Sequence, residues 1–253
     1  MDNTTQISLH NKIAIWTCSA TGSISTLSSV TLIYMIVSDR EVKLKTPNNR
    51  FLLVMSIINV VQSIAYAFSV LPLPRSSGTY AAIGNDLTCS IQGFIVQMGL
   101  LVPCYNACLC IWYLKSIKYN MTAEEFQQRF EPYCHAVSLL APFIFATVLA
   151  CFDKYAPRGY LCWVAEDDKY QLLISLLTGI FPFTSFIIIV YCLSSIHRSF
   201  VLLERQAQEH FTSGAASGVS WQQSNPNLNC KKKAAKQSLL FSCSFFITFF
   251  QYH

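Results

Sequence analysis

Six long apolar stretches, almost free of charged residues, run through this chain of 253 residues. A helix needs about 20 mainly apolar residues to cross the ~30 Å hydrocarbon core of a lipid bilayer. Each stretch reaches or approaches that length, so each is predicted to be a membrane-spanning helix. The predicted spans are residues 13–37, 51–71, 91–113, 136–152, 170–196 and 234–253. The sequence therefore predicts an all-α membrane protein, in which residues 1–253 form a single transmembrane bundle domain.

The overall composition agrees with a chain that lies mostly in lipid. Charged residues make up 12% of the sequence, against roughly 25% in a typical soluble domain. The longest polar segment, residues 198–233, is the predicted cytoplasmic loop and is unlike a second folded domain. We expect helix to continue into it as far as about His210, and a flexible chain rich in Ser, Gly and Asn over residues 211–229.

The first apolar stretch has two possible interpretations. The apolar core of a secretory signal peptide has about 7–15 residues. The stretch at residues 13–37 is longer than that and follows a polar N-terminal segment. We therefore expect a retained span, and a cleaved signal peptide is the alternative.

Lysine and arginine are distributed unevenly between the two sides of the predicted bundle. Placing the N-terminus outside assigns 13 of these 18 residues to cytoplasmic segments and 5 to outer segments, in the sense of the positive-inside rule. The glycosylation sequon that begins at Asn3 then lies outside, and the one that begins at Asn120 lies inside. These features predict a multi-pass protein of the plasma membrane with an outer, glycosylated N-terminus.

Two of the 11 cysteines fall in predicted outer loops. Cys89 and Cys162 would lie in the oxidising compartment, where disulfides persist, and each has only the other as an outer-loop partner. A bridge between them would draw the loop before the fifth span across the mouth of the bundle. Two free thiols are the alternative.

Three other cysteines are closely spaced in the predicted third span. Cys104 and Cys108 share a helix face, and Cys110 follows them. No His or carboxylate lies near them in the sequence, so we interpret them as small packing residues. The sequence therefore predicts neither a metal site nor a cofactor.

Candidate ligand-pocket residues lie near the predicted outer mouth. Gln92 and Gln97 are close to the outer end of the third span, where a ligand could reach them. Hydrogen bonding between helices is the alternative that we favour, because an amide in lipid needs a partner. Trp163 directly follows Cys162 and is the third candidate, with an aromatic side chain at the membrane interface as its alternative.

Several classes of protein do not fit the sequence. It contains no metalloprotease, nucleophile-elbow or phosphate-loop motif, so we do not expect an enzyme. Proton-coupled transporters need ionisable residues at membrane depth, and the predicted spans carry almost none. The positions of the charges favour a membrane surface over nucleic acid as the partner of this basic chain. Pro103, Pro142 and Pro182 lie inside predicted spans and can kink them.

Motifs in this chain resemble those of G-protein-coupled receptors, and most closely the cyclic-AMP receptor-like group. The pairing of Cys89 with Cys162-Trp163 is the most specific of them. The matching segments are Thr46-Pro47-Asn48-Asn49-Arg50 and Ser56-Ile57-Ile58-Asn59 in the second helix, Cys89-Ser90-Ile91-Gln92-Gly93-Phe94 with Gln97 in the third, Tyr133 with Pro142 in the fourth, and Cys162-Trp163-Val164 in the second outer loop.

The chain also departs from the pattern of that family. Asn59 stands where the second helix usually has an acidic residue, and Leu139 stands where a tryptophan usually precedes the fourth-helix proline. Residues 114–119 contain no Asp-Arg-Tyr-like triplet. The family has seven helices, whereas six are predicted here and the sixth is cut at His253. We therefore expect either a fragment or a truncated gene product.

The resemblance implies a receptor function. Such a protein would bind an extracellular ligand in the mouth of the bundle and shift its fifth and sixth helices, which would open a cytoplasmic cleft for a heterotrimeric G protein. Basic residues at the cytoplasmic base would contact that partner or, as we favour, anionic lipid headgroups. They are Lys115, Lys118, Arg198, Lys231, Lys232 and Lys233. The alternatives are a transporter or channel subunit, and a truncated receptor fragment that does not signal.

Overall fold

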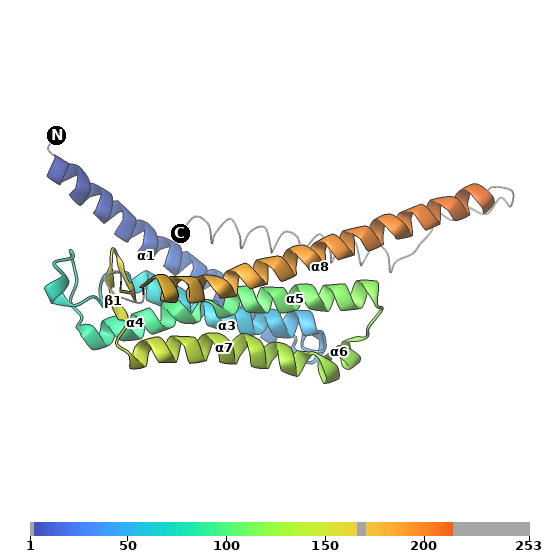
Figure 1. Cartoon of the computed structure of the whole chain (residues 1–253), viewed down its shortest axis with the longest axis horizontal. Helices are drawn as coiled ribbons and strands as arrows, with labels where there is room; N and C mark the ends of the chain where they lie inside the picture. The colour runs from blue at the N-terminus through green and yellow to red at the C-terminus, as the bar shows by residue number, and fades with distance from the viewer. Residues whose placement is uncertain (1–2, 166–170, 215–253) are drawn as a thin grey trace.

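Long helices make up most of this computed structural model, which describes residues 3–165 and 171–214 (Figure 1). The helices are α1 (Asn3–Val37), α2 (Arg40–Lys43), α3 (Pro47–Phe68), η1 (Arg75–Ser77), α4 (Asp86–Met98), α5 (Leu101–Lys118), α6 (Ala123–Arg129), α7 (Glu131–Cys151) and α8 (Gln171–Gly214). An antiparallel hairpin of β1 (Tyr155–Arg158) and β2 (Leu161–Val164) lies between α7 and α8. The sequence predicts only a loop at that place.

Five segments of the described chain are long enough and apolar enough to cross a membrane. They lie in α1, in α3, in α4 and α5 taken together, in α7 and in α8. The protein is therefore a multi-pass membrane protein, and these segments correspond to the first five predicted spans. The sixth predicted span, residues 234–253, lies outside the described residues.

The helices form a bundle around α5. α3, the consecutive α4 and α5, and α7 run side by side (Figure 1), while α1 packs on α3 and α8 packs on α5. α1 diverges from the bundle toward the end that carries the hairpin, and α8 projects past the opposite end, where α6 lies. We call these the hairpin end and the α6 end.

The third span is the central one. Most of its residues are buried inside the bundle, whereas the other four spans bury only a minority of theirs. Phe51 of α3, Tyr105 of α5 and Phe126 of α6 are almost completely buried and form the centre of the main apolar cluster. Large apolar side chains are exposed along α1, α7 and α8, which is the surface that a lipid environment favours.

Three helix starts follow from local sequence. α3 begins at Pro47, earlier than the predicted start of the span at residue 51, because proline has the φ of a first helical turn and lacks an N–H that has no partner there. Thr122 and Glu125 form a capping box before α6, with N···O distances of 3.3 and 3.1 Å. α7 begins at Glu131, earlier than the predicted start of the span at residue 136, and Pro132 lies in its first turn.

The third span is interrupted between α4 and α5, at Gly99 and Leu100. Pro103 has no N–H to donate to the Gly99 carbonyl, as a continuous helix would require. That carbonyl accepts from Val102 N at 3.1 Å instead, and the N–H groups of Gly99 and Leu100 each donate to the carbonyl three residues back. The kink that we predicted at Pro103 is therefore a break one turn earlier, in a span that extends over residues 86–118.

Other boundaries also differ from the predicted ones. α3 ends at Phe68 instead of residue 71, because Ser69 has a φ of 45°, outside the range of a right-handed helix. Pro142 lies inside α7 and Pro182 inside α8, and both helices continue past them. α8 runs on to Gly214, so the helix expected to about His210 is present, and the first residues predicted as flexible chain are helical.

Small residues allow α1 to approach α3 closely. A Cβ on Gly22 of α1 would lie 2.6 Å from Ala67 N and 2.8 Å from Ser63 O of α3. Ser63 Oγ donates to Ser25 Oγ across the same contact at 2.7 Å. Close backbone approach combined with hydroxyl hydrogen bonds is the usual way in which helices associate in a bilayer.

Candidate functional site

A disulfide joins Cys89 and Cys162 at the hairpin end. Cys89 lies near the start of α4 and Cys162 lies in β2, their Cα atoms are 5.3 Å apart, and both side chains are almost fully buried. The strands connect through a tight turn in which Gly159 has a φ of 63°. The bridge holds the hairpin against α4 at this end of the bundle.

Tyr155 fixes the other strand of the hairpin. A Cβ on Gly93 of α4 would lie 2.6 Å from the Tyr155 ring, so only glycine allows this contact. The Tyr155 hydroxyl donates to Ala146 O of α7 at 3.1 Å. Burial raises the pKa of Tyr155, which keeps the phenol protonated as a donor. The hairpin is thus held by both α4 and α7.

Both the nitrogen and the oxygen of the Gln92 side-chain amide form hydrogen bonds within the protein. Its Nε2 donates to Ala65 O at 3.0 Å and to Ser69 O at 2.7 Å, and its Oε1 accepts from Cys162 N at 3.0 Å. The side chain is buried and joins the end of α3, α4 and the hairpin. These contacts favour the packing alternative for Gln92 over direct contact with a ligand.

Only one of the two polar atoms of the Gln97 amide is hydrogen-bonded to another described residue. Its Oε1 accepts from Trp163 Nε1 at 3.0 Å. The side chain is 1% exposed, and its Nε2 has no hydrogen-bond partner among the described residues. A buried amide donor in this state is uncommon, and a water or an acceptor atom of a bound molecule would satisfy it. Gln97 and Trp163 are therefore the two ligand-pocket candidates that the structure brings together.

The α6 end contains a buried ion pair between α3 and α7. Arg50 Nε and Nη2 donate to Glu131 Oε1 and Oε2 at 2.5 and 2.6 Å, a bidentate geometry. Arg50 Nη1 also donates to Leu44 O, in the segment before α3, at 2.6 Å. The side chains of Arg50 and Glu131 are 19% and 7% exposed. The pair ties the start of α3 to the start of α7.

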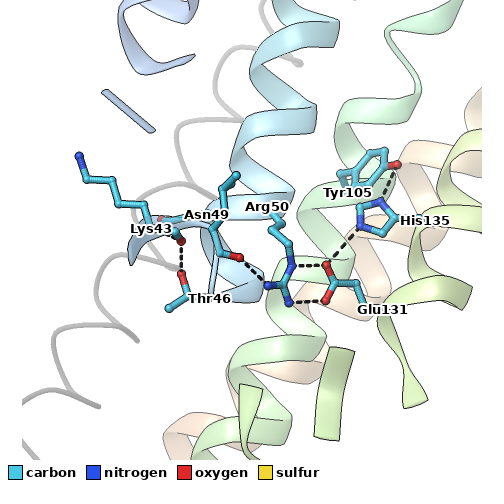
Figure 2. Close-up of polar contacts among 8 residues, drawn as sticks. Lys43, Thr46, Asn49, Arg50, Tyr105, Glu131 and His135 are labelled. Atoms are coloured by element: carbon cyan, nitrogen blue, oxygen red, sulfur yellow. Dashed lines mark hydrogen bonds and ion pairs between the residues drawn. The ribbon is translucent and has the colours of Figure 1, made fainter. Parts of the chain in front are cut away.

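His135 extends this ion pair into the core. Its Nε2 lies 3.5 Å from Glu131 Oε1, one turn earlier on α7, and its Nδ1 lies 3.1 Å from the Tyr105 hydroxyl of α5. Figure 2 shows the resulting row of four side chains, Arg50, Glu131, His135 and Tyr105. We call it the polar row. A separate hydrogen bond, from the Tyr113 hydroxyl to Asn48 Oδ1 at 2.7 Å, joins α5 to α3 at the same end.

The predicted basic residues on the described chain also lie at the α6 end. Lys115 Nζ lies 4.6 Å from the centre of the Phe130 ring, a cation–π contact. Lys118 Nζ donates to Ser195 Oγ of α8 at 3.2 Å. Lys118 and Arg198 are exposed. Lys115 and Lys118 therefore contact neighbouring protein groups in addition to any lipid or partner.

Other predicted site residues lie at or beyond the limits of the described chain. Asn3 is the first residue of α1, and its glycosylation stays a prediction. Lys231, Lys232 and Lys233 lie outside the described residues.

The polar row is absent from the sequence-based site prediction. Arg50 was named only as part of the second-helix motif at residues 46–50, and Glu131 lies before the predicted start of the fourth span at residue 136. The spacing of Glu131 and His135, four residues apart at the start of a helix, is the one local signal for part of the row. The partner of Glu131 on α3 is 81 residues away, and sequence spacing carries no information on such a contact.

No protein-family model and no curated protein matches this chain.

Proposed function

We propose that this chain is a G-protein-coupled receptor-like membrane protein, which senses an extracellular ligand at the hairpin end and signals to a heterotrimeric G protein at the α6 end. The observation that carries the proposal is the buried Nε2 of Gln97, which has no partner among the described residues and lies beside Trp163. The resemblance of the segments around Cys89 and Cys162 to cyclic-AMP receptor-like proteins supports the same interpretation.

The Gln97 amide limits the kind of ligand that would fit. Its Oε1 already accepts from Trp163, so the ligand must supply an acceptor for Nε2. A buried donor left unpaired costs about 1–3 kcal/mol, which a ligand acceptor would recover. The Trp163 ring beside it offers apolar and π contact. The ligand class that fits is a small molecule with an oxygen or nitrogen acceptor on an apolar or aromatic body.

A ligand at this point would contact elements that continue to the α6 end. Gln97 lies just before the break between α4 and α5, and Trp163 belongs to the hairpin tied to α4. α5 in turn carries Tyr105, which hydrogen-bonds to α7 within the core, and Tyr113, which hydrogen-bonds to α3 at the α6 end. A ligand that binds one arrangement of α4 and α5 more tightly than another shifts the population of both ends together.

The proposed orientation places the hairpin end outside the cell. The disulfide supports it, because disulfides persist in oxidising compartments, and so does the excess of Lys and Arg at the other end. A glycosidase should reduce the apparent mass of the wild-type chain made in eukaryotic cells and leave that of Asn3→Gln unchanged. Attachment of the glycan at Asn120 instead would reverse the orientation.

The receptor function can be tested with the full chain in lipid nanodiscs, together with a heterotrimeric G protein. A screen of small molecules that carry an acceptor group should find a class that accelerates nucleotide exchange. Gln97→Leu should weaken the apparent affinity for that class about tenfold, the equivalent of one buried hydrogen bond. Gln127→Leu, the same substitution on the exposed face of α6, should have no effect.

Two results would count against this proposal. A response that Gln97→Leu leaves unchanged would remove Gln97 from the ligand site. Absence of nucleotide exchange with every class, combined with movement of a solute into vesicles that contain the protein, would favour the transporter alternative.

A further inference from the structure

The hydroxyl oxygen of Thr178, on α8, is buried and has no hydrogen-bond partner among the described residues. Six other threonines in α1, α7 and α8 donate to the carbonyl four residues earlier at 2.7–2.9 Å, a bond that the threonine hydroxyl can make within any helix. Thr178 does not bond to the Ile174 carbonyl in this way. Its hydroxyl therefore needs a partner outside its own helix, as does the Nε2 of Gln97.

Contacts at two levels show how α8 lies against the third span. Near the hairpin end, Ile174 of α8 belongs to an apolar cluster that also contains Phe94 of α4 and Trp163 of the hairpin. Farther from that end, Ser185 Oγ of α8 donates to Cys104 Sγ of α5 at 3.9 Å. α8 and the third span therefore pass side by side, in the same direction, from the hairpin end toward the α6 end.

Thr178 and Gln97 lie between these two contacts, at the same level of the bundle. Thr178 lies one turn after Ile174 and about two turns before Ser185, on the same face of α8. Gln97 lies about two turns before Cys104 on the third span. The two buried groups without a partner therefore both lie where α8 passes the end of α4.

We propose that Gln97 and Thr178 are the two polar anchors of one binding site, which takes an uncharged small molecule with two polar groups. This inference rests on the proposed function, because it defines the ligand of the same site. Gln97 Nε2 can only donate, whereas the Thr178 hydroxyl can donate and accept. The ligand therefore carries an acceptor for Gln97 and a hydroxyl, carbonyl or amide group for Thr178, and it connects α4 to α8.

The ligand is uncharged because the helices around the site carry no charge. Residues 87–114, 136–152 and 171–196 contain no Asp, Glu, Lys or Arg, and Arg158 of the hairpin is exposed. A charged group held at the level of Gln97 would lose its hydration without gaining a counter-charge, which is strongly unfavourable. Anionic ligands, cyclic nucleotides among them, therefore do not fit this site, although the motifs of the chain resemble those of cyclic-AMP receptor-like proteins.

The test uses the full chain in lipid nanodiscs, without a G protein. The probes are a series of hydroxybenzamides, which are uncharged and carry two polar groups on an aromatic ring, and the matching hydroxybenzoates, which have nearly the same shape and a negative charge. Members of the first series should raise the midpoint of thermal unfolding as their concentration increases, and the second series should not. Thr178→Val and Gln97→Leu should each weaken the apparent affinity about tenfold.

Two further variants separate the Thr178 hydroxyl from general effects of substitution. Thr178→Ser keeps the hydroxyl and should bind the hydroxybenzamides as the wild type does. Thr184→Val is the matched control, because the exposed Thr184 already bonds to the Ile180 carbonyl of its own helix, and it should leave the affinity unchanged.

Three results would overturn the inference: equal stabilisation by the hydroxybenzoates, no stabilisation by either series, and binding that Thr178→Val leaves unchanged. None of them decides the receptor proposal, which nucleotide exchange on the G protein tests separately. A ligand class that drives exchange through Gln97 and not through Thr178 would leave the receptor proposal standing and refute this one. Binding that depends on both residues, without any exchange, would support this site and count against the receptor.

Discussion

Gln92 and Gln97 both lie in α4, but the amide nitrogen is hydrogen-bonded to other described residues only in Gln92. The same substitution at both positions should therefore give different results. Gln92→Leu would leave two carbonyls and the Cys162 N–H buried without partners, so we expect the free energy of unfolding to fall by about 2–4 kcal/mol. Gln97→Leu removes one hydrogen bond together with the unpaired donor, so we expect a change within about 1 kcal/mol. Thermal unfolding of both variants in the same detergent measures the difference, and equal losses would contradict it.

Replacing only one partner of the Arg50–Glu131 ion pair should lower the free energy of unfolding. Glu131→Gln leaves a mostly buried guanidinium without its counter-charge, and we expect a loss of about 3 kcal/mol in the free energy of unfolding. Arg50→Met in the Glu131→Gln background should recover part of that loss, because no buried charge is then left unpaired. A double-mutant cycle by thermal unfolding measures the coupling. Glu124→Gln on the exposed face of α6 is the control, and a similar loss there would refute a special role for the pair.

The roles of single residues were predictable from the sequence where the cellular compartment or a motif left few candidate residues. Cys89 and Cys162 could be paired because few cysteines fall in outer loops, and Gln97 and Trp163 were candidates because both lie near the mouth. The polar row was not predictable, because Arg50, Glu131 and Tyr105 belong to three helices whose contacts depend on how the bundle packs. The hydrogen-bonding states that separate Gln92 from Gln97 depend on the same packing.

At the scale of elements, the contact between α1 and α3 depends on the missing side chain of Gly22. Gly22→Ala would place a Cβ against the backbone of α3, and overpacking of this kind lowers the free energy of unfolding by about 1–3 kcal/mol. Gly179→Ala on α8 is the matched control, since a Cβ there meets nothing within 4 Å. It should raise stability by about 0.5–1 kcal/mol, because alanine has the higher helix propensity. Thermal unfolding that ranks the two variants in the reverse order would contradict the close approach of α1 and α3.

Element boundaries were predictable where a local signal fixes them. Pro47 marks the start of α3, and Thr122 with Glu125 marks the start of α6. The hairpin was missed because its strands are only four residues long and are held by the disulfide rather than by a sequence pattern. The length of α8 was underestimated because polar composition, which suggested a flexible loop, does not by itself end a helix.

At the scale of the whole molecule, the Cys89–Cys162 bridge should stabilise the fold strongly. It closes a loop of 73 residues, for which the chain-entropy model gives about 4 kcal/mol. The double variant Cys89→Ser with Cys162→Ser should therefore unfold at a markedly lower temperature than the wild type. Adding a reductant should lower the wild-type midpoint toward that of the variant and leave the variant unchanged. Equal midpoints for the oxidised wild type and the variant would rule out a stabilising bridge.

The overall architecture was the most predictable level. Span length and apolar composition depend on the bilayer rather than on detailed packing, so hydropathy alone located all five described spans. The central position of the third span, the oblique departure of α1 and the projection of α8 (Figure 1) were not predictable, because apolar stretches of similar hydropathy do not reveal which of them lipid surrounds.

The interruption at Gly99 and Leu100 gives the central span two halves with different attachments. α4 is bonded to the hairpin through Cys89 and to α3 through Gln92, whereas α5 is held to α7 through Tyr105, close to its start, and to α3 through Tyr113. Movement of the hairpin would therefore act on α4 directly, whereas α5 would keep its register through its own hydrogen bonds. α4 and α5 can thus respond separately, as a continuous helix through the membrane could not.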